Sequence, residues 1–425
     1  MKASEIKKKI CDGALKKYAS LYADTEAQKG RFTHIIDKFI SLYGDVEAEL
    51  LSVPGRSEIS GNHTDHNRGC VLAGAIDRDV IAIASKNDSG AVRFYSEGYP
   101  VCEIKLCECK NAQTYEKYTS SALIAGTVNG FCRNGYEVGG FDIAMTSDVL
   151  RGSGISSSAA FEVMIGNALN HLYNGGRIEN TEIAKIAQYA ENEYFGKPCG
   201  LMDQMACAVG GFVFIDFEDV KNPSVVPIDF SLDAAGYALC IVNTGGNHAD
   251  LNEDYASVPR EMKAVAASLD RDVLRGVSEG ELIAKIPELR DIHGDRAILR
   301  ALHFIRENNR VVKARDALVS GNLDGFFDVV NASGASSFKY LQNVYTTVNV
   351  SEQGLSLALA LAEEYLGGEG ASRVHGGGFA GTVQIFVKKT RLSGLVELMD
   401  SVFGKGSSMA LNVRPVGACS LDLFD

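Results

Sequence analysis

The stretch Pro54-Gly-Arg-Ser-Glu-Ile-Ser-Gly-Asn-His-Thr-Asp-His-Asn-Arg-Gly69 carries the strongest signal in this chain. Two arginines, two histidines, an aspartate and two asparagines lie between its glycines, directly after the mostly apolar run Leu50–Val53. A core segment can hold so many polar groups only at a large desolvation cost. A solvated loop would not need groups of such different hydrogen-bonding type so close together. The stretch therefore predicts one wall of a pocket for a polyhydroxylated ligand, built where a strand ends.

The composition narrows the class of protein. A length of 425 residues favours two domains, because it exceeds what one compact core usually contains. The net charge of −12 disfavours nucleic acid and anionic membrane surfaces as partners. The N-terminal residues lack the apolar core of a signal peptide, and no apolar stretch approaches the ~20 residues of a membrane span.

Cysteine usage indicates the compartment. The ten cysteines are scattered through the chain without a CxxC pair, and only Cys107 and Cys109 lie close together. This pattern is typical of reduced cysteines in a cytoplasmic protein, which we expect here. A metal site formed by Cys102, Cys107 and Cys109 is the alternative, but cysteines at strand edges are the commoner explanation.

Hydrophobic spacing predicts an α+β protein in two domains. Prolines 223 and 227 mark a boundary around residues 220–235, which divides the chain into domains of residues 1–230 and 231–425. The first fifty residues are expected to be helical. The expected helices that follow lie at 123–132, from the serine run to Asn174, from an N-cap at Asn180, and around 256–268, 296–318 and 352–366. The expected strands are 71–75, 80–84, 92–95, 101–104, 141–145, 211–217, 237–243 and 382–387.

A glycine- and serine-rich run at Leu150–Ala160 is the second signal. Gly152 and Gly154 let the backbone approach a ligand closely, and Ser156, Ser157 and Ser158 stand where a helix begins. A helix N-terminus with free N–H groups is a ready site for phosphate. A capped serine-rich loop without a ligand is the alternative, and the residues alone leave both open. The run Gly376–Gly381 satisfies GxGxxG but precedes a strand, so its context excludes a dinucleotide site.

Two carboxylates stand in apolar surroundings. Glu191 continues the inward row of Ile183 and Ala187 on a helix expected over 181–195, so its carboxylate faces the packed side. A salt bridge or a Mg²⁺ site near the phosphate loop would explain it. Asp203 is the one acid in the segment Cys199–Met205, where it either caps a helix or takes part in chemistry.

Together these motifs resemble the GHMP sugar-kinase superfamily, and most closely its galactokinase family. The opening stretch resembles the galactokinase signature, whose usual form is G-R-x-N-L-I-G-E-H-T-D-Y. Leu150–Ala160 resembles the superfamily's ATP loop, and Ser372–Gly381 resembles its glycine-rich third motif. Cys199–Gln204 matches the family's C-G-I-M-D-Q nearly letter for letter. Four motifs in this order span residues 54–381, most of the chain.

The resemblance implies a ribosomal-S5-like N-terminal domain, a ferredoxin-like C-terminal domain and a site between them. It implies ATP-dependent phosphorylation of a sugar at its anomeric hydroxyl. Asp203 would either accept the hydroxyl proton or orient the hydroxyl, with Arg56 near the transferred phosphoryl group. Ser158 and Glu191 would hold Mg²⁺. The ATP phosphates would be surrounded by Gly152, Ser153, Gly154, Ser156, Ser157 and Ser158, and the sugar would be contacted by Asn62, His63, Asp65, Gly200 and Tyr255.

The chain departs from the usual signature at several positions. Glu58 stands where the family has Asn, Ser60 where it has Ile, and His66 where it has Tyr. Asn62 stands where the family has a Glu that hydrogen-bonds a sugar hydroxyl. An asparagine keeps an acceptor oxygen, gains donors and loses the charge.

Three functions are compatible with these departures. A divergent galactokinase is favoured, because Arg56, His63, Asp65 and Asp203 are all retained. An anomeric kinase for a modified galactose, such as galacturonate or N-acetylgalactosamine, is the second hypothesis. A non-catalytic sugar and ATP sensor is the third, and the retained catalytic pair argues against it. The sequence gives no indication of the oligomeric state.

Overall fold

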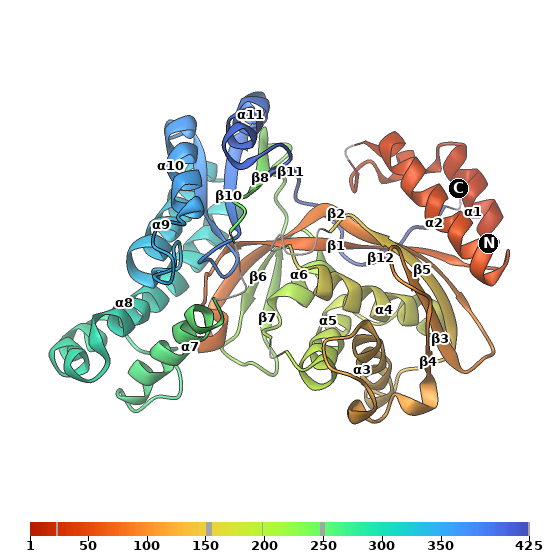
Figure 1. The fold of residues 1–425 in the computed structure, drawn as a ribbon, viewed down its shortest axis with the longest axis horizontal. Coiled ribbons are helices and arrows are strands. Elements are labelled where there is room, and N and C mark those ends of the chain that lie inside the picture. Colours follow the sequence, from red (N-terminus) through yellow and green to blue (C-terminus); the bar gives the residue numbers. More distant parts are fainter. Residues whose placement is uncertain (23, 150–154, 198, 247–250, 424–425) are drawn as a thin grey trace.

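A computed structural model describes residues 1–22, 24–149, 155–197, 199–246 and 251–423 (Figure 1). Within these residues the strands form two sheets, one in each half of the chain. The α+β architecture predicted from the sequence is confirmed. None of the helices in the described ranges combines the length and the apolar content of a membrane span. All ten cysteines are free thiols.

The first sheet is built around two long strands that cross the molecule (Figure 1). Its order is β12-β1-β2-β5-β3-β4, and β6 and β7 continue it from β2. Neighbours are antiparallel except β3 and β5. The strands are β1 (Glu49–Ser60), β2 (Cys70–Lys86), β3 (Ala91–Ser96), β4 (Cys102–Lys105), β5 (Phe141–Ser147), β6 (Phe212–Asp216), β7 (Ser224–Ile228) and β12 (Cys419–Ser420).

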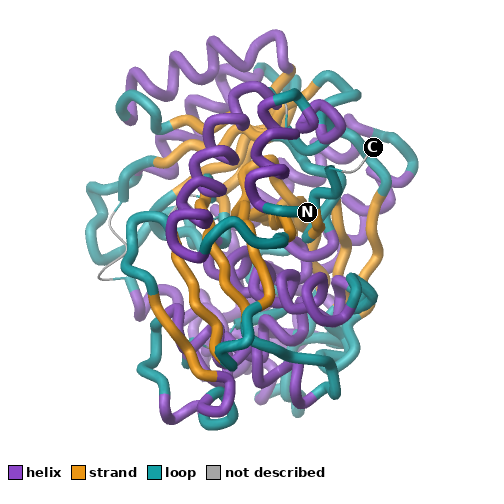
Figure 2. The backbone as a smooth tube through the Cα atoms, turned by 90° about the vertical axis from the view of Figure 1, so that its right-hand side faces the viewer, coloured by secondary structure: helices purple, strands orange, loops and turns teal. Residues whose placement is uncertain are grey.

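Helices cover both faces of this sheet, so β1 and β2 are buried nearly throughout. One face carries α3 (Ser120–Arg133), α4 (Ser157–Asn174), α5 (Asn180–Tyr189) and α6 (Met202–Val209). The other face carries α1 (Ala3–Cys11) and α2 (Thr25–Tyr43). The N-terminal helices face the viewer in Figure 2, and Lys9 Nζ of α1 donates to the carbonyl of Leu423, near the other end of the described chain.

The second sheet has the order β11-β8-β10-β9 and is antiparallel throughout. Its strands are β8 (Tyr237–Asn243), β9 (Gly370–His375), β10 (Thr382–Lys388) and β11 (Ser408–Leu411). The helices of this half are α7 (Asn252–Ala267), α8 (Glu279–Val319), α9 (Leu323–Ser336), α10 (Gly354–Leu366) and α11 (Leu392–Phe403). Gly294, at φ 76°, kinks α8.

Most of the predicted elements of the first half are confirmed, and two details are corrected. The predicted strands 71–75 and 80–84 are parts of the single strand β2. Helix α4 ends as predicted, where Gly175 at φ 62° returns its N–H to Asn170. The N-cap of α5 is Glu179, because Asn180 turns its amide to the carbonyl of Ala418. The helices α9 and α11 and the strand β9 were missed.

The prediction that a strand ends before the opening stretch is wrong. Strand β1 continues to Ser60, so Arg56, Ser57 and Glu58 lie on it and are buried. Register shifts on either side of this segment mark two irregularities of the β1–β2 ladder. The desolvation cost is offset by partners from the second half of the chain. Gln384 of β10, for example, donates to Ser57 Oγ and to the carbonyl of Glu58.

The division of the chain near residue 230 remains a prediction. Strand β7 ends at Ile228 in the first sheet, and β8 begins at Tyr237 in the second. Strand β12, from the end of the chain, returns to pair with β1. We therefore propose a boundary between β7 and β8, with the last residues belonging to the first unit.

Candidate active site

Arg56 and Asp203 form a partly buried ion pair between β1 and the first turn of α6. The guanidinium donates through both Nε and Nη2 to Asp203 Oδ1, at 2.8 and 2.7 Å. Ser156 Oγ donates to the other carboxylate oxygen, Oδ2, at 2.5 Å. Both oxygens of Asp203 are thereby fixed, while a third of its side chain stays exposed. The carboxylate is oriented by the protein and still accessible.

The electrostatics of this pair keep Asp203 ionised. Burial alone would raise the pKa of Asp203, but the Arg56 charge and the hydrogen bonds from Ser156 and Arg56 lower that pKa below its usual value. Asp203 is therefore a weak proton acceptor and a strong hydrogen-bond acceptor at neutral pH.

Ser156 also begins the predicted phosphate helix. Its backbone lies in the left-handed region at φ 60°, an unfavourable conformation that proteins keep mainly at functional sites. Helix α4 starts at the next residue, Ser157, so its free N–H groups and positive dipole end face the Asp203 side. The Arg56 N–H donates to the carbonyl of Ile155, which ties the end of the loop to β1. Three residues of the predicted loop, Gly152, Ser153 and Gly154, lie outside the described residues.

Glu191 and Ser158 lie together behind this helix start, as the prediction of a metal pair requires. Their side-chain oxygens are 3.5 Å apart, and Glu191 is almost fully buried. Gln204 Nε2 donates to Glu191 Oε2 at 2.7 Å, and Lys197 Nζ lies 3.4 Å from Oε1. The salt bridge considered as an alternative for Glu191 is thus present. It uses a lysine that is more than half exposed.

A second buried carboxyl, Glu162, lies one turn after Ser158 on α4. Its Oε2 accepts from Gln204 at 3.2 Å, and its Oε1 has no hydrogen-bond partner among the described residues. Burial and the nearby charge of Glu191 raise the pKa of Glu162 well above its usual value. An orphaned buried oxygen beside a hydroxyl and a carboxylate is a donor set that suits a hard cation.

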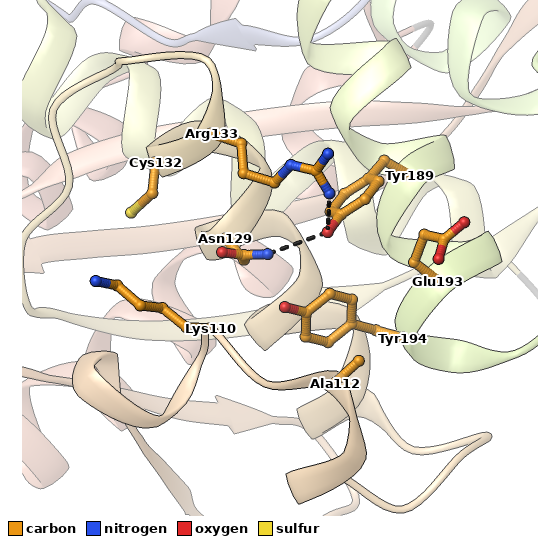
Figure 3. A pocket seen from close by; sticks show the side chains of 8 residues that line it. All are labelled: Lys110, Ala112, Asn129, Cys132, Arg133, Tyr189, Glu193 and Tyr194. Carbon is orange, nitrogen blue, oxygen red and sulfur yellow. Dashed lines mark hydrogen bonds between the residues drawn. The ribbon is translucent and has the colours of Figure 1, made fainter.

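The segment that carries Glu191 is a π-helical turn, η5 (Ala190–Phe195), anchored from behind. A hollow of about 530 Å³ lies beside it. Figure 3 shows the side chains that line this hollow, among which Asn129 and Arg133 both donate to the hydroxyl of Tyr189. A Cβ at Gly126 of α3 would lie 2.8 Å from Ala190, so the turn is held tightly against α3. π-Helical turns are rare and often accompany functional sites.

The predicted sugar residues gather on the other side of Asp203. Asp65 lies against Gly200, where an added Cβ would meet its Oδ2 at 2.5 Å. His63, at φ 58°, reaches the carbonyl of Gly377 through Nε2 at 3.0 Å. The Tyr255 hydroxyl donates to the carbonyl of Gly378 at 2.8 Å. The glycine-rich motif Ser372–Gly381 therefore contacts both the opening stretch and α7 through Gly377 and Gly378.

The pKa of Asp65 is shifted in the opposite direction from that of Asp203. Burial raises the pKa of Asp65, and the charge of Asp203 adds to this, against the opposing effect of His63. Two carboxyl groups with pKa values pushed apart are typical of catalytic and binding sites.

Asn62 is placed differently from the prediction. Its amide is fully buried, and Nδ2 donates to Glu58 Oε1 at 3.0 Å and to the carbonyl of Gly376 at 2.7 Å. Its Oδ1 accepts from Asn343 at 2.7 Å and from Ser337 at 3.3 Å. All hydrogen-bonding positions of the amide are engaged within the protein. The expectation that Asn62 contacts the sugar is corrected accordingly.

Comparison with known proteins identifies the family. The galactokinase galactose-binding signature matches residues 37–86, and the GHMP kinases N-terminal domain matches residues 120–211. The galactokinase of Streptomyces coelicolor is 30% identical over 367 residues, covering 86% of this chain and 91% of the relative. The chain belongs to the galactokinase family of sugar kinases.

Further relatives agree with this assignment. The Lactococcus lactis subsp. lactis galactokinase is 29% identical over 393 residues, covering 89% of this chain and 93% of that one. The crystal structure of Lactococcus lactis galactokinase complexed with galactose superposes with a TM-score of 0.76 at 26% identity, covering 91% and 98% of the two chains. Methanococcus jannaschii mevalonate kinase, at 15% identity and a TM-score of 0.61, shares the fold, with 86% and 98% coverage.

One feature of this galactokinase-family site was missed by sequence reasoning. A hollow of about 700 Å³ opens beside the start of α4, and Ser157 and Ser158 line its edge. Its other walls come from β3, β5 and the N-terminal end of α3, so no local pattern reveals it. The largest side chains around it are Phe94, Tyr99, Tyr118, Met145, Phe161 and Phe195.

Residues of α8 that hold the signature were also missed. Glu307 Oε1 accepts from the N–H of Gly61 at 3.1 Å, and His303 Nε2 contacts the carbonyl of Asn62 at 2.9 Å. Both side chains are fully buried. Their spacing of four on an apolar helix face is a signal that could have found them.

Proposed function

We propose that the protein transfers the γ-phosphoryl group of ATP to the anomeric hydroxyl of galactose, giving galactose 1-phosphate and ADP. The single observation that carries the proposal is the fixed carboxylate of Asp203. Arg56 and Ser156 hold its two oxygens, and it lies between the start of α4 and the Asp65–Gly200 contact. Phosphoryl transfer depends mainly on in-line positioning and on neutralising charge, and this arrangement supplies both.

In this proposal Asp203 orients the sugar hydroxyl by accepting its hydrogen bond. The lowered pKa of Asp203 makes early proton abstraction unfavourable, so the proton leaves late, as the new O–P bond forms. Arg56 acts in two ways. It holds the carboxylate, and its cation lies near the position where charge develops on the transferred group.

The N-terminus of α4 would bind the phosphates of ATP, and the adjacent hollow would take the adenine. Backbone N–H groups from Ser157 onward and the helix dipole favour an anion there. The chain contains no tryptophan, so base stacking would fall to aromatic side chains of the hollow such as Phe161. The loop residues Gly152, Ser153 and Gly154 are proposed as phosphate contacts on the family resemblance alone.

Ser158 and Glu191 would hold Mg²⁺, with the buried Glu162 behind them. The ion prefers octahedral oxygen ligands and usually takes only one or two from the protein, the rest coming from water and phosphate. When bound, it neutralises charge on the ATP phosphates. The 3.5 Å contact between Ser158 and Glu191 and the unpartnered Oε1 of Glu162 support a site of this sparse kind.

His63, Asp65, Gly200 and Tyr255 would surround the sugar. Asp65 offers carboxylate oxygens to hydroxyl groups, and Gly200 leaves the space that Asp65 occupies. Tyr255 and His63 are both bound to backbone carbonyls of the third motif, which fixes the position of their rings. We also propose a cytoplasmic location, which the ten free cysteines support.

A second candidate substrate is a modified galactose, such as galacturonate or N-acetylgalactosamine. The observation in its favour is the neutral, buried amide of Asn62 at the position where the family signature has a glutamate. A carboxylate-bearing sugar would meet one negative charge fewer at this point of the pocket.

An ADP-release assay over a sugar panel decides between the candidates. We expect the highest kcat/KM with galactose and lower values with galacturonate and N-acetylgalactosamine. A higher value with galacturonate would make the modified sugar the substrate. Tight sugar and ATP binding without ADP release on any member of the panel would reject a kinase and point to a sensor.

A further inference from the structure

Glu58 and Asn62 occupy each other's places in the signature. The usual form, G-R-x-N-L-I-G-E-H-T-D-Y, has an asparagine at the position of Glu58 in this chain. It has a glutamate four residues later, at the position of Asn62. The pair of positions therefore still contains one glutamate and one asparagine. Its net charge is unchanged, and only the order of the two residues differs.

The two exchanged side chains touch each other. Asn62 Nδ2 donates to Glu58 Oε1 at 3.0 Å, and both side chains are buried. Substitutions at residues in direct contact are not independent, because each changes the partner of the other. The exchange is thus one structural event at one contact.

The carboxylate of Glu58 is matched by a cation from the second half of the chain. Arg373 Nη2 lies 3.1 Å from Glu58 Oε1, and Arg373 Nη1 donates to the carbonyl of Ile59 at 2.9 Å. Arg373 is fully buried. Removing one partner of a buried ion pair leaves an uncompensated charge. Position 58 therefore needs its carboxylate in this chain.

Position 62 needs an amide for the complementary reason. Asn62 Nδ2 donates to two acceptors, the Glu58 carboxylate and the carbonyl of Gly376. An ionised glutamate has no donors. At both contacts its carboxylate oxygens would face another acceptor oxygen without a hydrogen between them. Its carboxylate could not remain at this place and would turn out toward the neighbouring His63.

We infer that Glu58 and Asn62 are a coupled pair that moves the negative charge of the signature out of the sugar pocket and into the Arg373 contact, and thereby sets substrate selectivity. The pair is a specificity determinant that acts by position, since all hydrogen-bonding positions of the Asn62 amide are engaged within the protein and Glu58 Oε1 is held by Asn62 and Arg373. The claim about substrate selectivity rests on the proposed anomeric kinase activity. The claim that Glu58 and Asn62 are energetically coupled does not.

The test is a double-mutant cycle with Glu58→Asn, Asn62→Glu and the reversed pair carrying both substitutions. Urea unfolding of the purified full chain measures the coupling. Each single variant should lose stability, and the reversed pair should be more stable than the sum of the two single effects predicts. Glu49→Asn, an exposed position on the same strand, should leave the urea midpoint unchanged. Single effects that simply add would overturn the coupling.

Kinetics of the folded reversed pair measure the selectivity. The ratio of kcat/KM for galactose to that for galacturonate should rise at least tenfold over the wild type, because a carboxylate returns to the pocket. A ratio equal to that of the wild type would overturn the selectivity inference, since a merely structural pair would not move it. Failure of the proposed function would show differently, as absent turnover by the wild type on every sugar.

If the reversed pair does not fold, Glu58→Gln/Asn62→Asp serves as the second variant. It exchanges amide and carboxylate between the two positions with little change in the size of either side chain, so an amide still faces a carboxylate at this contact. The same rise in the galactose preference is expected. An unchanged preference in this folded variant would equally overturn the inference.

Discussion

Arg56 binds a single oxygen of Asp203 through two nitrogens, Nε at 2.8 Å and Nη2 at 2.7 Å. The second oxygen is left to Ser156. This arrangement fixes the plane of the carboxylate and holds its pKa low against the effect of burial. A lysine cannot reproduce it, because an ammonium is a point charge without the planar fork of the guanidinium.

Arg56→Lys should therefore lower kcat by about 10²-fold, in the range found when one preorganised donor is removed from a site. It should also weaken the effect that lowers the pKa of Asp203, so that burial prevails and the pKa rises. When the pH is lowered, the variant would then lose activity at a higher pH than the wild type. The measurement is the pH profile of kcat for both proteins. Arg93→Lys, in a bridge to Asp142 elsewhere on the sheet, is the matched control and should shift neither quantity.

Gly200→Ala should raise the KM for the sugar at least tenfold, because the new Cβ would lie 2.5 Å from Asp65 Oδ2 and displace that carboxylate. The KM for ATP should change little. Steady-state kinetics with each substrate varied in turn measure both values. Gly280→Ala, where an added Cβ meets nothing within 4 Å, is the control. A sugar KM within twofold of the wild type would show that Asp65 does not contact the sugar.

Phe161→Ala should weaken ATP binding by roughly tenfold or more, if base stacking in the hollow has its usual strength of about 1–3 kcal/mol. Sugar affinity should stay the same, because Phe161 belongs to the hollow beside α4. Calorimetric titrations with each ligand separate the two effects. Phe338→Ala, at an exposed position of the second half, controls for the loss of an aromatic ring. Equal ATP affinity in wild type and Phe161→Ala would place the adenine elsewhere.

His303 should make the protein less stable in mild acid. Burial lowers the pKa of His303 to about 4, against the opposing charge of Glu307. The unfolded chain takes up this proton near pH 6.5, whereas the folded protein does so only near pH 4. Stability is therefore lost as the pH falls through this window, by about 1.4 kcal/mol per pH unit for this group.

Urea midpoints between pH 7.5 and 5 test this effect. His303→Gln should unfold more easily at pH 7.5, because it loses a contact with Asn62 or Ser336. Its stability should nevertheless depend less steeply on pH than that of the wild type. His293→Gln, on the half-buried surface of α8, should keep the wild-type slope. An unchanged slope in His303→Gln would mean that folding does not lower the pKa of His303.

The sequence identified the residues that belong to short motifs. Arg56, Asp203 and the serines at the start of α4 are each marked by the local pattern of their own motif, although their contacts join three separate motifs. The burial of β1 could not be predicted in this way. It depends on Arg373 and Gln384, which lie more than 300 residues along the chain and satisfy Glu58 and Ser57.

The same reason explains the other errors. Asn62 was expected to contact the sugar because it stands at the position of the family's sugar-binding glutamate, but its amide is taken up by Gly376 and Asn343. The hollow beside α4 is assembled from segments between Val80 and Phe195, none of which is unusual alone. Long-range pairing decides such features, and single-sequence patterns do not record it.

The most direct test of this account is the comparison of Asp203→Asn with the wild type, in ADP release and in galactose binding by calorimetry. An asparagine keeps the size of the side chain but loses the charge that Arg56 and Ser156 fix. The account predicts that galactose still binds within tenfold of the wild-type affinity while turnover is lost by at least 10³-fold. Turnover close to that of the wild type would contradict both proposed roles of Asp203.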